Sequence, residues 1–164
     1  MKKLIYTLIP LFMFSCADLG QEKVESTVTK NSESDDITFI IDLKVNADTT
    51  EDLKFFVEEI TNNVINTEDF CLEYAYYISD DNSSVTLYEK YVDSKSAVQH
   101  GQNFISGSFF DRFFNLFTLE KFIVTGPATD EFKTFTQDNG FVIEYRNSVD
   151  AVSYTHLTLP TNGE

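Results

Sequence analysis

Residues 85–104 constrain the fold more than any other part of the sequence. They read VTLYEKYVDSKSAVQHGQNF, in which apolar and polar side chains first alternate and then, past an acidic turn, recur at helical spacing. Alternation predicts a strand, and the spacing of Ala97, His100 and Phe104 predicts a helix. Asp93 or Ser94 is placed to cap that helix. The segment is therefore predicted to be a strand that leads directly into a helix carrying His100.

The segments before this unit predict a strand, a helix and a second strand. Residues 37–45 alternate in polarity, so we expect a strand buried mainly on one face. A helical stripe follows, with Asp48, Thr49 or Thr50 as its cap, and it comprises Leu53, Phe56, Val57, Ile60 and Val64. Residues 70–78 alternate again, and the polar loop of residues 79–84 joins them to residues 85–92 as a hairpin.

The segments after the unit complete the order of elements. A stripe of phenylalanines over residues 109–117 predicts a second helical piece. Residues 119–125 form a final core strand, which the Gly126-Pro127 turn closes. A short helix around residues 129–137 and a strand around residues 141–146 follow.

The core order of strand, helix, strand, strand, helix, strand predicts an α+β fold, of the ferredoxin-like βαββαβ type with an antiparallel sheet. Both helices of such a fold cover one face of the sheet and leave the other bare. Apolar residues also fall on the alternate positions, namely Ile40, Ala75, Tyr77, Tyr88 and Val92. A homodimer that closes two sheets into a barrel would cover them, so we expect a dimeric α+β barrel.

The amino terminus has the pattern of an export signal. Two lysines precede an apolar run over residues 4–14, which is too short to span a bilayer but has the length of a secretory signal core. Cys16 follows Ser15, as in a bacterial lipobox, so residues 1–15 are predicted to be a lipoprotein signal peptide and Cys16 the lipidation site. The protein would then be exported and lipid-anchored to a bacterial cell-envelope membrane. An ordinary signal peptide with an incidental cysteine is the alternative, and residues 16–36 are expected to be a flexible tether.

Composition excludes several classes of site. The formal net charge of −15 argues against a nucleic-acid partner, because phosphate binding needs basic patches. With Cys16 lipidated, Cys71 has no partner within the chain, so we expect a small buried thiol and no disulfide. No spacing of Cys and His offers the ligands that zinc needs, so no metal site is predicted.

The carboxyl end differs in character from the rest of the chain. Residues 148–164 are predicted to be a disordered or artefactual tail. From about residue 152 the sequence closely resembles the peptide obtained by translating sequencing-adapter read-through, so residues 152–164, including His156, are not expected to contribute to function. A genuine disordered tail is the alternative.

The strand and helix of residues 85–104 resemble the antibiotic biosynthesis monooxygenase-like (ABM) family of dimeric α+β barrels. The matching residues are Leu87, Glu89 and Tyr91 on the strand, followed by Asp93, Ala97 and His100. Residues 70–74 resemble the second strand of the family. The resemblance covers about residues 37–125, and residues 37–147 are taken as the ABM-like domain.

The resemblance implies a cofactor-independent monooxygenase-like oxidoreductase that acts on a small aromatic or quinol-type compound. Family members that act on polycyclic quinols use the substrate's own reactivity toward oxygen, without flavin or metal. His100 and Glu89 would be catalytic and manage protons. The substrate-binding residues would be Tyr76, Tyr77, Tyr88 and Phe104. A related haem-degrading branch uses an Asn, a Trp and a His, and the lack of Trp in this chain disfavours that reaction.

A non-catalytic lipoprotein that holds an apolar ligand or a protein partner is the alternative function. In that case His100 is a hydrogen-bonded structural histidine, and Glu89 pairs across the sheet or with a backbone donor. The phenylalanines of residues 109–117 would then serve core or dimer packing.

Overall fold

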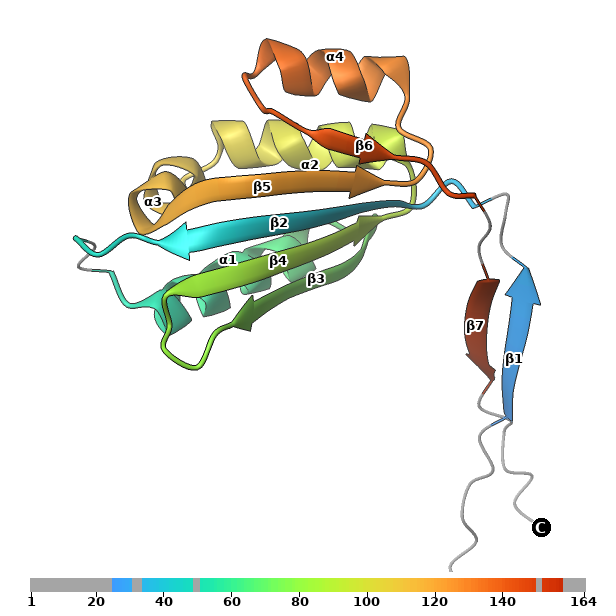
Figure 1. Cartoon of the computed structure of the whole chain (residues 1–164), viewed down its shortest axis with the longest axis horizontal. Helices are drawn as coiled ribbons and strands as arrows, with labels where there is room; N and C mark the ends of the chain where they lie inside the picture. The colour runs from blue at the N-terminus through green and yellow to red at the C-terminus, as the bar shows by residue number, and fades with distance from the viewer. Residues whose placement is uncertain (1–24, 31–33, 49–50, 150–151, 158–164) are drawn as a thin grey trace, which may run out of the picture. The chain divides into compact units, whose positions relative to one another are not determined.

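The computed structural model describes residues 25–30, 34–48, 51–149 and 152–157 (Figure 1). It divides into a larger unit of residues 29–153 and a smaller one of residues 1–28 and 154–164. The predicted signal peptide and Cys16 lie outside the described residues. Among the residues that are described, no helix has the length and apolar character needed to cross a membrane.

The larger unit is built on a five-stranded sheet in the order β3-β4-β2-β5-β6. The strands are β2 (Ile37–Val45), β3 (Cys71–Ile78), β4 (Ser84–Tyr91), β5 (Phe117–Thr125) and β6 (Glu144–Arg146). The helices are α1 (Leu53–Thr67), α2 (Ser94–Ser106), α3 (Phe109–Leu116) and α4 (Asp130–Asp138). Strands β2 to β5 with α1 and α2 have the order and antiparallel pairing of the ferredoxin-like fold, which confirms the predicted fold class. The edge strand β6 is an addition that runs parallel to β5.

The helices α1 and α2 lie together on one face of the sheet (Figure 1). On the central strand β2, alternate residues from Ile37 to Leu43 are buried against them, and the residues between are half-buried on the opposite face. Because of this period of two, the strand predicted over residues 37–45 has the same bounds as β2. The core of the unit therefore fills the space between the sheet and the helices.

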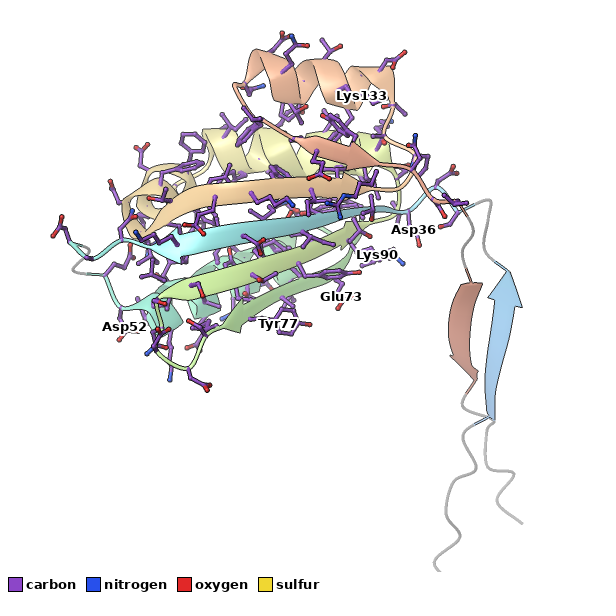
Figure 2. All side chains as sticks on the ribbon, in the orientation of Figure 1. Asp36, Asp52, Glu73, Tyr77, Lys90 and Lys133 are labelled. Carbon is purple, nitrogen blue, oxygen red and sulfur yellow. The ribbon has the colours of Figure 1, made fainter. Side chains whose placement is uncertain are left out.

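The other face of the sheet carries an apolar row. Ile40 pairs with Tyr88 on one side and with Ile123 on the other, and Ala75 lies opposite Tyr88. Paired residues share a face, so these four side chains form a continuous row across the sheet. Tyr77 belongs to the same face, is 60% exposed and is labelled in Figure 2.

The predicted N-terminal cap of α2 is confirmed, and the predicted cap of α1 is wrong. Asp93 caps α2, since its side chain accepts a hydrogen bond of 2.7 Å from the Ser96 N–H. For α1 the predicted caps, Asp48, Thr49 or Thr50, are wrong. The cap is Asp52, which accepts a hydrogen bond of 2.9 Å from the Phe55 N–H. It directly precedes the first helical residue, where a short acidic side chain can reach the free N–H groups.

Two further strands lie in ranges that the sequence assigned to a flexible tether and to a disordered or foreign tail. β1 (Glu25–Lys30) and β7 (Val152–Leu157) pair as a two-stranded sheet. Both contain β-branched residues, and β7 also contains a tyrosine, which suits an extended backbone. The foreign origin of the tail stays a prediction.

An arginine of α3 binds residues in and just before α1, beside ring contacts of Phe56 with Phe109 and Phe113. Arg112 of α3 forms ion pairs with Glu51 and with Glu59, the latter at 2.7 Å. Its guanidinium carbon also lies 5.2 Å from the ring centre of Phe56 and 5.3 Å from that of Phe109. Together these contacts place the phenylalanines of α3 against the core.

Substituting Gly101 tests how closely α4 packs on α2. A Cβ at Gly101 would lie 2.5 Å from Cε1 of the Phe135 ring, so Gly101→Ala must displace that ring. Overpacking of this kind costs about 1–3 kcal/mol, against a gain of about 1 kcal/mol in helix propensity. We expect a net loss of free energy of unfolding, measured by urea denaturation. Gln102→Ala, at an exposed position of α2, is the control. A more stable Gly101→Ala would contradict the close packing.

Candidate functional site

A buried carboxylate lies on the inner face of the sheet. Leu87, Glu89 and Tyr91 alternate along β4 and face the helices, and Glu89 is only 3% exposed. The Tyr91 hydroxyl donates a hydrogen bond of 2.8 Å to Oε2 of Glu89. Phe39 of β2 and Tyr74 of β3 flank Glu89 in the sheet. The strand register thus holds an ionisable side chain in an aromatic core.

His100 lies between this carboxylate and a second one. Nδ1 of the imidazole is 2.7 Å from Oε2 of Glu68, and Nε2 is 3.6 Å from Oε2 of Glu89. Glu68 is the residue at which α1 ends, and its backbone N–H donates to the Val64 carbonyl. Asn103, one turn after His100 on α2, donates a hydrogen bond of 3.0 Å to Oε1 of Glu68. The site therefore joins α1, α2 and β4.

The two carboxylates have opposite pKa shifts. Burial raises the pKa of Glu89 above its usual value, although the charge of His100 and the Tyr91 hydroxyl oppose this. Burial also acts to raise the pKa of Glu68, but the hydrogen bond and charge of His100, with Asn103, lower it overall. Burial alone would lower the pKa of His100, but the two carboxylates outweigh it and raise that pKa. The cluster therefore favours an imidazolium ion paired with ionised Glu68.

A cavity of about 70 Å³ opens beside the edge of the cluster formed by His100 and Glu89. Its walls are mostly aromatic and aliphatic, and they come from the inner face of the sheet and from α2, α3, α4 and Phe141. The side chains from α3, from α4 and from the segment after α4 are Phe113, Phe114, Phe132, Phe135, Thr136 and Phe141. A cavity that holds benzene measures about 150 Å³, so a ring-sized ligand requires these side chains to shift.

A second, open groove lies on the other side of His100. It measures about 460 Å³ and is bordered by α1, α2 and the start of α3. Glu68 and Asn103 border it, together with exposed polar residues such as Asn63 and Ser106. His100 therefore contacts a small apolar cavity on one side and a polar groove on the other.

The structure brings some of the predicted site residues together. His100 and Glu89 are adjacent, and the Phe104 ring lies parallel to the imidazole, with the ring centres 6.4 Å apart, and lines the cavity. Tyr76 is on the inner face, where its hydroxyl lies 3.2 Å from that of Tyr74 and its ring stacks on Phe117. It is not among the residues that line the cavity.

Two of the predicted substrate-binding residues lie elsewhere. Tyr77 and Tyr88 are on the outer face of the sheet, away from His100 and the cavity. The reason is the period of the strand, because Tyr77 follows an inward Tyr76 and Tyr88 lies between inward Leu87 and Glu89. Their assignment to a site that contains His100 was wrong.

Sequence reasoning missed three members of the cluster. Tyr91 lies two residues after Glu89 on a strand and Asn103 three residues after His100 on a helix, so spacing alone could have placed them beside these residues. Glu68 carries no such signal, because it follows the last turn of α1, and its partner on α2 is distant in sequence. Within the described part of the chain, no group of three or more His, Cys, Asp or Glu residues is arranged to hold a metal ion.

Comparison with known proteins supports the fold. No protein-family model matches the chain, and no curated protein matches it. The crystal structure of MupZ from Pseudomonas fluorescens is similar, with a TM-score of 0.58 and 15% identity over 79% of this chain and 98% of that chain. A Bacteroides thetaiotaomicron protein of unknown function, described as a possible oxidoreductase, has a TM-score of 0.47 and 15% identity over 56% and 96% of the two chains. A Caulobacter crescentus protein described as a candidate antibiotic biosynthesis monooxygenase has a TM-score of 0.37 and 15% identity over 76% and 91%.

Replacing Glu68 tests the electrostatics of the cluster through the pH dependence of stability. The folded pKa of His100 lies above its ordinary 6.5, so its pairing stabilises fully below pH 6.5 and is lost as pH rises through the folded pKa. The folded pKa of Glu68 lies below its ordinary 4.5, so its contribution is present above pH 4.5 and is lost as pH falls through the folded pKa. Removing one partner of a buried pair costs about 3 kcal/mol or more.

We therefore expect Glu68→Gln to lose most stability between pH 4.5 and 6.5 and less at high pH. Urea unfolding of both proteins over this range measures the difference, with Glu58→Gln on the exposed side of α1 as the control. A loss that does not vary with pH would contradict the ionic pairing.

Proposed function

We propose that the chain is a cofactor-independent monooxygenase that oxidises a small aromatic compound of the quinol type. One observation carries this proposal, namely that His100 and Glu89 form an ionisable pair on the wall of a mostly apolar cavity. Such a cavity suits a flat apolar ring, and the polar pair suits a hydroxyl on that ring. The sequence resemblance to the ABM family supports the same reaction class.

The proton chemistry follows from the positions of the side chains. Glu68 holds the Nδ1 side of His100, so Nε2 and the Glu89 carboxylate are the groups that meet a ligand in the cavity. A carboxylate whose pKa is raised by burial accepts a proton from a phenolic hydroxyl better than an exposed one. The imidazolium beside it stabilises the negative charge that develops on the ring.

Oxygen then reacts with the deprotonated ring. The deprotonated ring gives two electrons in succession to dioxygen, and a carbon–oxygen bond forms at the ring carbon that lies para to the hydroxyl and carries a hydrogen. Glu89 returns its proton to make the hydroperoxide. Glu89 next removes the hydrogen from that carbon, the oxygen–oxygen bond breaks, and the hydroxide that leaves takes the same proton. One oxygen atom of dioxygen enters the quinone product and the other leaves as water. The mostly apolar walls of the cavity offer water few hydrogen-bond partners beside the reacting atoms.

A non-catalytic binding protein is the second candidate, and one observation favours it. Within the described residues, every buried polar side-chain atom has a hydrogen-bond partner. A cluster in which Glu68, Glu89 and Nδ1 of His100 have hydrogen-bond partners also serves as a stable polar centre of a core that holds an apolar ligand. The two candidates differ in whether replacing His100 changes turnover or only stability.

The proposal includes the location of the protein. The sequence of residues 1–16 supports export and lipidation at Cys16, which would anchor the domain to a membrane of the bacterial cell envelope. The ligand would then be a compound of the cell envelope or its surroundings.

We also propose that two copies of the chain associate through the outer face of the sheet. The half-buried side chains of Ala75, Tyr88 and Ile40 form an apolar row on a face that α1 and α2 do not cover, with buried Ile123 at one end, and exposed Tyr77 extends it. Polar pairs flank the row, such as Thr86 and Asp42, whose side chains share a hydrogen bond of 3.1 Å. An apolar centre with a polar border is the usual composition of a subunit interface.

Oxygen uptake tests the enzymatic proposal. With a panel of quinols that includes a dihydroxyanthrone, we expect uptake by the wild type and a fall in kcat of about 100-fold or more for Glu89→Gln and His100→Gln, as for loss of a general acid–base group. Tyr88→Phe, on the outer face, is the control and should keep full activity. Uptake that the site variants do not change would refute the mechanism. Retention of an apolar ligand in native mass spectrometry, without any uptake, would favour the binding protein.

Light scattering tests the association. We expect a dimeric mass for the wild type and a monomeric mass for Ile40→Lys, because a charge at the centre of the apolar row cannot be paired across the interface. Gln102→Lys places the same charge on exposed α2 and should leave the dimer intact. Circular dichroism confirms that each variant is folded, and a monomeric wild type would end this proposal.

A further inference from the structure

We propose that Glu68 is the solvent end of a proton pathway, which runs from the cavity through Glu89 and His100 to the groove between α1 and α2. The inference rests on the proposed function, in which a proton leaves the substrate and later returns to the peroxide. It assigns to Glu68 a role in moving protons in addition to its role in holding the imidazole.

The position of His100 between two spaces carries the proposal. The side chains that border both the cavity and the groove are Tyr74, His100 and Phe104. Phe104 carries no proton to transfer, and the Tyr74 hydroxyl is directed to Tyr76, 3.2 Å away. Only the imidazole of these three has two titratable nitrogens, one toward each space. A proton that crosses between the cavity and the groove by this route must therefore pass through His100.

Each nitrogen of His100 has a carboxylate on its own side. Nε2 lies 3.6 Å from Glu89, which borders the cavity, and Nδ1 lies 2.7 Å from Glu68, which borders the groove. The longer distance requires a small rotation of a side chain to make a hydrogen bond, as is common before a ligand binds. The Asn103 amide holds the Oε1 atom of Glu68, which leaves Oε2 to the imidazole.

The protons and bonds balance over the cycle. The outward step begins with neutral His100, whose proton is on Nδ1. Glu89 gives the substrate proton to Nε2, which forms the imidazolium that pairs with Glu68. The imidazolium then gives its Nδ1 proton to Glu68, and Glu68 gives it to water in the groove. Imidazole is then neutral with its proton on Nε2. The return step runs the same transfers backward, which restores the first tautomer without a turn of the ring. The substrate thus stays deprotonated while oxygen reacts.

The surroundings of His100 leave these three groups to carry the proton. The titratable groups that face it are Glu68 from α1, Glu89 and Tyr91 from β4, and Tyr74 from β3. Burial raises the pKa values of Tyr74 and Tyr91 well above their ordinary range, so both hydroxyls keep their protons.

Proton exchange at His100 tests the pathway without turnover. Nitrogen NMR on the full chain with labelled histidine follows the ring N–H groups of His100, with His156 as an internal reference. The amide of Glu68→Gln fills the same space but cannot take a proton, so we expect exchange of the His100 ring protons with water to slow by about tenfold or more. If Glu68 only positions the ring, its loss loosens the site and exchange becomes faster, which would overturn the proposal. Asn63→Ala, on the border of the same groove, should leave the rate unchanged.

Chemical rescue gives a second measurement that does not depend on the folding of one variant. Glu68→Ala leaves a space on the open groove, so added formate should restore exchange at His100 with a saturating dependence on its concentration. Glu89→Ala leaves its space at the apolar cavity, where an anion is poorly solvated, so formate should not restore oxygen uptake there. The absence of rescue in folded Glu68→Ala would overturn the pathway.

Turnover separates this inference from the proposed function. Where the wild type oxidises a quinol, Glu68→Gln should lower kcat about tenfold or more with little change in KM and should alter the pH–rate profile. An unaltered profile would refute the pathway while the oxygenase stands. Where no quinol is oxidised, the oxygenase fails, and the exchange and rescue measurements still decide the pathway.

Discussion

The ion cluster of Glu68, His100 and Glu89 sets the arrangement of the elements around it. A buried charge costs several kcal/mol unless it is paired, and these three side chains come from the end of α1, the middle of α2 and the inner face of β4. Rotating α2 by one residue or ending α1 one turn earlier would leave a buried charge without a partner. Hydrogen bonds from Tyr91 and Asn103 occupy further acceptor positions. The aromatic core is thus built around a polar centre that tolerates little change in helix position.

The chain after β5, which comprises α4 and the segment up to β6, forms one wall of the cavity beside His100 and Glu89. The core strands and α2 supply part of the cavity walls, but Phe132, Phe135 and Phe141 come from α4 and the segment after it. The approach of α4 depends on Gly101, because any side chain there would meet the Phe135 ring. The elements added to the ferredoxin-like core are therefore the ones that enclose the site.

The sequence predicts the elements well because their periods are local. The alternation over Ile37–Val45 locates β2 to the residue, and the polar turn at Asp93 locates the start of α2. The same alternation, applied strictly, separates Tyr76 from Tyr77 and shows that Tyr88 cannot share a site with His100. The role of Glu68 could not be predicted from local periods, since no pattern in the neighbouring residues indicates a buried carboxylate. Its role depends on packing between residues 32 positions apart.

The two sides of His100 differ in the way that directional proton movement requires. On the cavity side the dielectric constant is low, so each charge interacts strongly with its neighbours and a proton shift between Glu89 and the imidazole changes the energy of a ligand directly. On the groove side, water and exposed polar groups surround the route to Glu68 and stabilise either charge state. An imidazole that bonded only to Glu68 would be a structural histidine, and one that faced only the cavity would lack a path to solvent. Its place between the two, with a carboxylate on each nitrogen, links the protonation state of the cavity to the pH of the medium.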